Sequence, residues 1–423
     1  MKDYLLKNAK LYRNHCFEET DILVIDGYIK TIQKDIHSEL PTYDLSHMLV
    51  SHNFIDMHTH LREPGYEHKE TIASGSLAAL YGGYGTIVAM ANTLPCMDDQ
   101  ETIDDFRHRV EENAHINVYT YSAITKDLKG QELVDMRGLV QNDIVLGFSD
   151  DGKGVQKDDM MESAMRTVKD IDSIIVAHCE DESELHGGCI HEGKYAKEHG
   201  LIGINSASEY KQVARDLDIV RQYHNRYHVC HISTKETVAL LKQAESEGLS
   251  VSGEAAPHHL ILTEENIKDC HPNYKMNPPL RSVEDHQALI QGLNEGTIPV
   301  IATDHAPHAR EEKAVSIQKA PFGIIGIQHA FPLLYTYLVK KGLVSLETIL
   351  DALTIGPAKV LKLDADVKEG SLANLCIFDL NAQFEITEDS IKSKSINTPF
   401  LGVKCFGKIK ANIVNGEYIE MEE

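Results

Sequence analysis

Eight short apolar runs that alternate with amphipathic helical segments predict an α/β fold for this chain, a (β/α)8 barrel of the TIM type. A second observation supports the barrel, because His, Asp and Asn residues gather at the carboxyl ends of nearly all these runs. Only a closed barrel brings eight strand ends around one point. With 423 residues, 42% of them apolar, the chain is long enough for one large domain and an accessory piece.

The predicted strands follow one another along the chain, and each is bounded by polar residues or glycine. They span residues 54–60, 85–92, 115–124, 144–152, 173–181, 227–234, 249–259 and 298–308. Helical spacing of apolar residues lies between them at 70–83, 101–114, 159–171, 208–225 and 235–248. Ser233 or Thr234 is suited to cap the last of these helices. The alternative architecture is a doubly wound open sheet, but no GxGxxG turn follows the first strand.

The two ends of the chain resemble each other and differ from the barrel. Residues 1–50 and 365–423 contain short strand-like runs separated by turns such as Asp26-Gly27 and Asn415-Gly416. We expect these ends to pair into one small composite β-domain. The catalytic barrel would then span residues 51–364.

The composition excludes several classes of partner. Asp and Glu outnumber Lys and Arg by 65 to 41, and the net charge of −24 argues against nucleic acid or an anionic membrane surface. The N-terminus has no apolar signal region, and no run of about 18 apolar residues would span a bilayer. We therefore expect a cytoplasmic protein. Eight dispersed cysteines without a CxxC pair predict reduced thiols, so a metal would have His and carboxylate ligands.

The first predicted strand ends in an alternating polar pattern that contains His58, His60 and Arg62. Side chains alternate along a strand, so the two histidines share one face, and Arg62 shares it if the extended geometry persists. An HxH pair alone supports a metal site and a pair of satisfied core histidines about equally.

The other strand ends favour the metal site. Polar residues directly follow the apolar parts of the fourth, fifth, sixth and eighth strands: Asp150 and Asp151, His178, His231, and Asp304. Unpaired His and Asp side chains are costly in an interior, and a divalent ion would compensate several of them together. Imidazole and carboxylate ligands without thiolate suit Zn²⁺, with Mn²⁺ and Co²⁺ as alternatives.

Five motifs occur in a fixed order along the chain: DMHTHLREPG, AHCED, HIST, KMNPPLR and ATDHAPH. Together they resemble the dihydroorotases of the amidohydrolase superfamily, and specifically the bacterial class I type. The resemblance runs from about residue 50 to residue 330 and includes both flanking ends. It implies one or two zinc ions per chain, held by His58, His60, Asp151, His178, His231 and Asp304. It also implies a catalytic, proton-moving role for Asp304, and substrate contacts from His60, Leu61, Arg62, Asn92, Asn277 and His308.

The residue that would bridge two ions has alternatives. Many superfamily members use a carbamylated lysine after the fourth strand, whereas this chain has GFSDDGKGV at residues 147–155. The resemblance to bacterial dihydroorotases with the same Asp-Asp-Gly favours Asp151. Asp150 is an alternative, and so is Lys153, although it lies beyond Gly152, where the chain should have left the strand. If the bridging residue binds weakly or is absent, the site would operate with one metal ion.

The reaction that the resemblance implies is the reversible cyclisation of N-carbamoyl-L-aspartate to L-dihydroorotate, the third step of UMP synthesis. A metal-activated hydroxide would open the ring amide, and Asp304 would take its proton and return it to the leaving nitrogen. Arg62 suits bidentate binding of the substrate carboxylate, with a salt bridge at the barrel rim as the alternative. The polar segment 308–323, which ends in Phe322 and Gly323, would fold over the substrate; a solvated surface loop is equally supported.

Two rival functions belong to different classes. A hydantoinase or allantoinase would share the barrel and the metals, but Arg62 and an Asp in place of the bridging lysine favour dihydroorotase. A non-catalytic scaffold would have lost ligands, whereas every expected ligand is present here. The family further suggests a homodimer, or association with aspartate transcarbamoylase.

Overall fold

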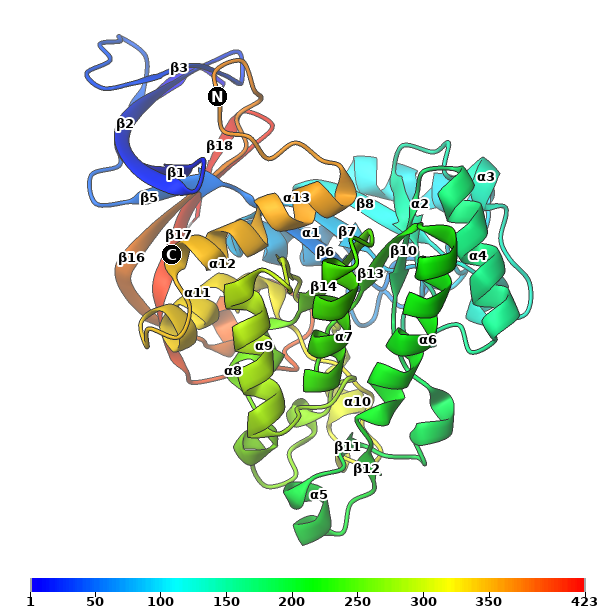
Figure 1. The fold of residues 1–423 in the computed structure, drawn as a ribbon. Coiled ribbons are helices and arrows are strands. Elements are labelled where there is room, and N and C mark those ends of the chain that lie inside the picture. The colour runs from blue at the N-terminus through cyan, green and yellow to red at the C-terminus, as the bar shows by residue number, and fades with distance from the viewer. Residues whose placement is uncertain (1, 422–423) are drawn as a thin grey trace.

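The computed structural model describes residues 2–421 and contains a barrel of eight parallel strands joined in sequence order (Figure 1). A parallel bridge between Thr59 and His305 links the segment just after the last strand to the first strand, and His60 N donates to His305 O at 2.9 Å. The predicted (β/α)8 fold is therefore confirmed. The barrel strands are β6 (Phe54–Thr59), β7 (Tyr84–Ala89), β8 (Asn117–Ser122), β9 (Val145–Phe148), β10 (Ile174–Ala177), β13 (Arg226–Val229), β14 (Val251–Ala255) and β15 (Val300–Ile301).

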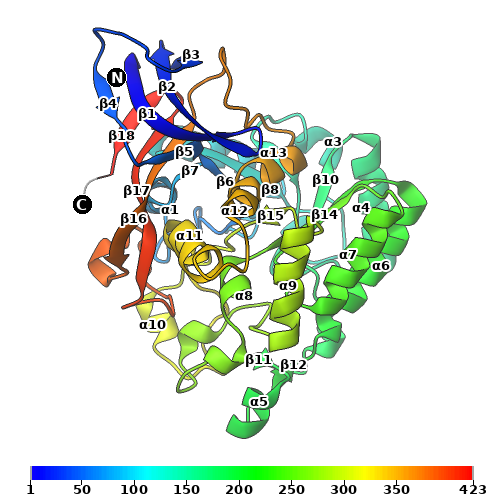
Figure 2. The same ribbon diagram turned by 60° about the vertical axis from the view of Figure 1, so that its left-hand side comes forward.

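Helices cover the outside of this barrel (Figures 1 and 2). Thr71 caps the first of them by accepting from Ser74 N, and Thr234, not Ser233, caps the helix after β13 by accepting from Thr237 N. The larger helices are α1 (Ile72–Tyr81), α2 (Gln100–Asn113), α4 (Asp158–Asp170), α6 (Ala207–Tyr223), α7 (Lys235–Ser246), α9 (Val283–Glu295), α12 (Leu346–Leu353) and α13 (Ile355–Leu361). Shorter ones are α3 (Met136–Leu139), α5 (Lys194–His199), α8 (Pro257–Ile261), α10 (Arg310–Lys313) and α11 (Ala330–Leu334).

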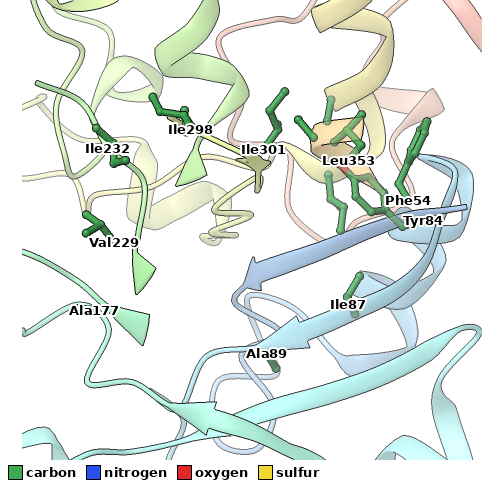
Figure 3. Packing of buried hydrophobic residues seen from close by; sticks show 14 of the residues in the cluster. Phe54, Tyr84, Ile87, Ala89, Ala177, Val229, Ile232, Ile298, Ile301 and Leu353 are labelled. Atoms are coloured by element: carbon green, nitrogen blue, oxygen red, sulfur yellow. The ribbon is translucent and has the colours of Figure 1, made fainter. Parts of the chain in front are cut away.

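Alternation along the strands builds two apolar layers. On β10, Ile175 and Ala177 belong to the layer packed against the helices, whereas Val176 belongs to the inner cluster within the barrel. Figure 3 shows Ala177, Val229 and Ile301 of the outer layer, on three different strands. Because both faces are apolar, the strands are held rigidly, and so are the residues at their carboxyl ends.

Several strands end earlier than their polar residues suggested. β6 ends at Thr59, and Arg62 has a φ of 63°, so the extended geometry that would place Arg62 on the same face as His58 and His60 does not persist to Arg62. The chain turns there, because Tyr66 N donates to Arg62 O at 2.9 Å. Strand pairing also ends early at β15, which leaves Asp304 in the following loop.

The two chain ends form one mixed sheet beside the barrel, in the order β18-β17-β16-β5-β1-β2-β3, with β4 paired to β1. The join between the ends is the antiparallel pair β5–β16, in which Val50 lies opposite Ile377. Apolar residues from both ends, among them Leu11 and Ile413, form a separate core cluster. The predicted composite β-domain is therefore present. Its strands are β1 (Tyr4–Arg13), β2 (Cys16–Ile25), β3 (Tyr28–Gln33), β4 (Thr42–Asp44), β5 (Leu49–His52), β16 (Leu375–Glu385), β17 (Lys404–Val414) and β18 (Glu417–Glu420).

Two hairpin turns from opposite ends of the chain meet in this sheet. Asp26-Gly27 and Asn415-Gly416 all have positive φ, as two-residue hairpin loops require. A Cβ on Gly416 would lie 2.2 Å from the Cα of Gly27. Both turns therefore need glycine for their contact as well as for their conformation.

The segment between β16 and β17 leaves the sheet and reaches the barrel mouth. Asn397 donates from Nδ2 to Ala306 O and Gly323 O, both at 3.1 Å, and its Oδ1 accepts from His308 N at 3.1 Å. The C-terminal part of the chain thus contributes to the region of the predicted site. All eight cysteines are free thiols. Among residues 2–421, the structure contains no helix long and apolar enough to cross a bilayer.

Candidate metal centre and active site

Asp151 lies at the centre of a cluster of four histidines at the carboxyl ends of the barrel strands. Its Oδ1 is 3.4 Å from His58 Nε2, 3.4 Å from His178 Nδ1 and 3.5 Å from His231 Nε2. Its Oδ2 is 3.4 Å from His60 Nε2. One carboxylate therefore faces all four imidazoles, which come from β6 and from the turns after β6, β10 and β13.

Asp304 completes the cluster from the turn after β15. Its Oδ1 is 3.1 Å from His60 Nε2 and 3.6 Å from His58 Nε2. The ligand atoms fall into two compact groups that could each hold a cation: His58, His60 and Asp304, and Asp151, His178 and His231. A third group combines His58 and Asp151 with Cys230, but burial raises the pKa of the Cys230 thiol well above its ordinary value, which disfavours a thiolate ligand.

Two atoms of the cluster are buried without any hydrogen-bond partner among the described residues, His58 Nε2 and Asp151 Oδ1. Such atoms are costly in an interior, and a cation between them would satisfy both. The donor set of imidazole nitrogen and carboxylate oxygen is one that zinc and similar divalent ions use. The residues present therefore fit a metal centre.

The backbone at this site is unusual. His231 has a φ of 30° and Asp304 a φ of 48°, in the left-handed region that residues other than glycine seldom adopt. Each lies just beyond its barrel strand, where the turn directs the side chain toward Asp151 and the other histidines. Strained residues of this kind concentrate at functional sites.

The structure distinguishes the three residues that sequence analysis considered as the bridge. Asp150 turns away from the histidines and accepts from Ile124 N at 2.7 Å and Thr125 N at 3.0 Å. Lys153 is exposed. Burial alone would raise the pKa of Asp151, but the charge of His58 and the adjacent imidazoles of His178 and His231 lower that pKa well below its usual range. Only Asp151 is both central and ionised.

Glu254 lies directly behind His58, and sequence reasoning missed it. Its Oε1 is 2.6 Å from His58 Nδ1, and its Oε2 is 3.1 Å from His228 Nε2. Burial opposes ionisation of Glu254, yet the charge of His58 and hydrogen bonds from both histidines lower its pKa to about 2. A carboxylate that accepts from Nδ1 leaves Nε2 of His58 as the free ligand atom.

A cavity of about 220 Å³ opens above the metal-binding cluster. It is lined by His60, Arg62, Asn92, Asp151, Gly152, His178, His231, Asn277, Asp304, Ala306, His308, Phe322 and Gly323. Most of the sequence-predicted substrate contacts therefore lie around one space. Leu61 is the exception, because it does not line the cavity and its buried side chain packs beside Gly75 of α1.

The rim residues have fewer fixed partners than the floor. Arg62 Nε donates to Pro307 O at 3.2 Å, and Asn277 Nδ2 donates to Glu180 Oε1 at 2.8 Å. Glu180, which sequence reasoning also missed, is 3.0 Å from His178 Nε2 and so links the floor to the rim. His308 is buried, and burial together with the charge of Arg62 lowers its pKa to about 2, so its imidazole is neutral.

The fold and this site define a class, the metal-dependent hydrolases of the amidohydrolase superfamily. Known proteins agree with that class. The structure superposes on L-hydantoinase (dihydropyrimidinase) from Arthrobacter aurescens with a TM-score of 0.90, at 25% identity over 100% of this chain and 97% of that one. A dihydropyrimidinase from Brevibacillus agri shares the fold, with a TM-score of 0.87 at 19% identity over 98% and 94% of the two chains.

Sequence relatives narrow the class to one family. A dihydroorotase from Bacillus cereus is 46% identical over 100% of this chain and 99% of its own length, and one from Bacillus cytotoxicus is 45% identical with the same coverage. The family model described as dihydro-orotase-like matches residues 47–237. The chain belongs to the dihydroorotase family and is a cyclic amide hydrolase.

Proposed function

We propose that this enzyme interconverts L-dihydroorotate and N-carbamoyl-L-aspartate, the ring-closing third step of UMP synthesis. The observation that carries this proposal is the 46% identity, over the whole chain, with a Bacillus protein named dihydroorotase. The L-hydantoinase reading has weaker support, since it comes from a structural likeness at 25% identity. A non-catalytic scaffold has none, because all six predicted ligands lie in one cluster and five of them line the cavity.

The metal that we propose is zinc, in one or two ions per chain. His58, His60 and Asp304 would hold one ion, His178 and His231 the other, and Asp151 would bridge them. Support comes from the two ligand groups and from the orphaned atoms on His58 and Asp151. Bound zinc would lower the pKa of water from 15.7 to roughly 7 and polarise the amide carbonyl.

Asp304 is the residue that we propose moves the proton. It lies at the cavity, and burial favours its neutral form, but the hydrogen bond from His60 and the charge of His58 lower its pKa. An ionised Asp304 can accept a proton during hydrolysis and deliver it to the leaving ring nitrogen. In the direction of ring closure the same group would start protonated.

The substrate's carboxylate would bind at the rim. Arg62 offers a guanidinium suited to bidentate contact, and Asn92, Asn277 and the neutral imidazole of His308 offer further polar groups on the same cavity. The backbone of Leu61, together with Phe322 and Gly323, would close the remaining sides. His60, between the two ligand carboxylates, would touch both metal and substrate.

We further propose the bacterial class I type, because Asp151 stands where a bridging lysine would otherwise be expected. The catalytic barrel would span residues 51–364 and the small domain residues 1–50 and 365–423, consistent with the separate core cluster of the chain ends. A cytoplasmic homodimer, or an assembly with aspartate transcarbamoylase, is what the family resemblance supports.

The deciding experiment compares hydrolysis of dihydroorotate, hydantoin and allantoin by metal-reconstituted protein, with metal content measured on the same sample. We expect turnover of dihydroorotate alone, with one or two zinc ions per chain. Preferential turnover of hydantoin or allantoin would establish the rival enzyme, and metal-loaded protein without any activity would support the scaffold.

A further inference from the structure

Two lysines are buried next to the cavity, where the loop at residues 272–277 meets the segment 308–323. Lys275 is 4% exposed and Lys313 is 5% exposed. A buried ammonium costs several kcal/mol unless it is compensated, and lysine is seldom buried without a partner. No carboxylate among residues 2–421 pairs with either amino group, so the compensation has another origin.

Lys313 reaches from the segment 308–323 to the neighbouring loop. Its Nζ donates to Pro272 O at 3.0 Å, to Lys275 O at 3.2 Å and to Pro321 O at 2.9 Å. An ammonium has three N–H donors, and here each one has a backbone acceptor. Two of those acceptors belong to the loop 272–277 and one to the segment itself, so one side chain ties the two together.

Lys275 makes the opposite connection. Its Nζ donates to Gln318 O at 2.9 Å and lies 4.4 Å from the centre of the Phe322 ring, while Gly323 N donates to Lys275 O at 3.0 Å. Each lysine therefore anchors the loop from which the other one comes. The contacts combine charge-assisted hydrogen bonds with a cation–π contact.

The two joined segments carry a large part of the cavity wall. Asn277 lies just after Lys275, and His308, Phe322 and Gly323 lie on either side of Lys313 in the chain; all four line the cavity. Burial and the charge of Lys275 lower the pKa of Lys313 to about 7, which shows that the charged form is held at a cost. Apolar side chains of similar size would fill the space without the cost of burying a charge. The lysines therefore contribute directional hydrogen bonds that apolar side chains could not make.

We propose that Lys275 and Lys313 form a reciprocal clasp that holds the segment 308–323 closed over the cavity and positions its substrate contacts. The lysines touch backbone and Phe322, so they are positioning residues and take no part in the chemistry. The kinetic part of this proposal rests on the proposed function, whereas the structural part does not.

The test uses full-length, metal-loaded protein and the variants Lys313→Met and Lys275→Met. Methionine keeps the length of the side chain and removes the donors. Lys319→Met is the matched control, because Lys319 lies in the same segment and is exposed. Hydrogen exchange of the peptides covering 308–323, metal content, and kcat and KM for dihydroorotate are measured for each protein.

We expect the segment 308–323 to exchange at least ~10-fold faster and KM to rise by ~10-fold or more in both clasp variants, the equivalent of about 1.4 kcal/mol. Metal content and kcat should change little, and Lys319→Met should match the wild type. A purely structural role of the two lysines would lower thermal stability without raising KM at nearly constant kcat. Unchanged exchange in a folded clasp variant, or faster exchange with unchanged KM, would overturn the proposal.

A measurement on the wild type keeps the proposal testable if both variants fail to fold. Amine-selective acetylation of the native protein should label Lys319 readily and Lys275 and Lys313 slowly, since both are bonded and buried. Equal labelling of all three lysines would contradict a closed clasp. If the wild type does not turn over dihydroorotate, the proposed function fails, while the exchange and labelling results still decide the clasp.

Discussion

The floor and the rim of the cavity are built in different ways. Floor residues such as His58, Asp151 and His231 lie at or just beyond strand ends, are at most 3% exposed, and each contacts further polar groups of the cluster. Rim residues such as Arg62 and Asn277 lie on loops and are only half-buried. The barrel fixes the floor, whereas the loops and their anchors determine the rim.

This difference separates chemistry from substrate choice. The hydantoinase of Arthrobacter aurescens superposes with a TM-score of 0.90 although only 25% of residues are identical, so the same barrel fold is found in enzymes named for different activities. Metal-binding geometry depends on strand ends that such a fold preserves. Recognition of a particular ring depends on loops, which can vary without changing the barrel. Substitutions in the two regions should therefore fail in different ways.

The largest effect should come from the floor, in His58→Ala. Removing this imidazole leaves only His60 and Asp304 in one ligand group. It also removes a neighbouring imidazole from the buried carboxylate of Asp151. We expect loss of bound metal and of essentially all activity, measured by metal analysis and dihydroorotate turnover. His68→Ala, at an exposed position, is the control. Stoichiometric metal with normal turnover in His58→Ala would refute the ligand set.

Asp304→Asn should remove the proton-moving group while keeping its size. We expect substrate to bind and kcat to fall by at least ~10²-fold in both directions, the lower end of what a positioned acid or base contributes. Hydrolysis needs Asp304 ionised and ring closure needs it protonated, so hydrolysis should rise with pH and ring closure should fall. Equal pH profiles in the two directions would assign the proton to another group.

Local patterns explain why the floor could be predicted from the sequence. The spacing of His58 and His60 places both side chains on one face of their strand. His178, His231 and Asp304 each follow an apolar run, and in a barrel the carboxyl ends of all such strands lie at the same face. These features involve neighbouring residues, so they are visible without the fold. Arg62 shows the limit, because its turned backbone depends on contacts that no strand pattern encodes.

Long-range partners could not be predicted in this way. Glu254 meets His58 across 196 positions of sequence, and Asn397 meets His308 across 89. A glutamate inside a strand and an asparagine in an irregular segment carry no local signal of function. The burial of Glu254 within a predicted strand was the only available hint, since an acidic residue at such a position requires a partner.

Glu254→Gln should have an intermediate effect, because it weakens support behind the floor without removing a ligand. The loss of the charged acceptor at His58 Nδ1 should lower metal affinity by roughly 10- to 100-fold, as is typical of such outer partners. Competition with a chelator measures the affinity directly. Glu295→Gln, exposed at the end of α9, serves as the control. Unchanged affinity would show that another group orients His58.

Arg62→Met tests the rim. We expect KM for dihydroorotate to rise by roughly 10-fold or more with metal content unchanged, because a charge-assisted hydrogen bond is worth about 1.5–3 kcal/mol. Metal content and KM are measured on the same preparation. If the variant loses metal or unfolds instead, Arg62 has a structural role at the barrel rim. The distinction between floor and rim would then not apply to Arg62.

Gly416→Ala should have the smallest effect on catalysis, because it changes the composite sheet and neither part of the cavity. Its new Cβ would lie 2.2 Å from Gly27 Cα, at a residue whose φ is 80°. We expect about 1–3 kcal/mol of lost stability from this overpacking, measured by denaturant unfolding, with kcat and KM unchanged. Gly402→Ala separates the two causes, because Gly402 has a φ of 77° but open space around its position. A smaller loss in Gly402→Ala would assign the difference to contact between the two hairpin turns. Reduced activity in folded Gly416→Ala would show instead that the chain ends influence the cavity.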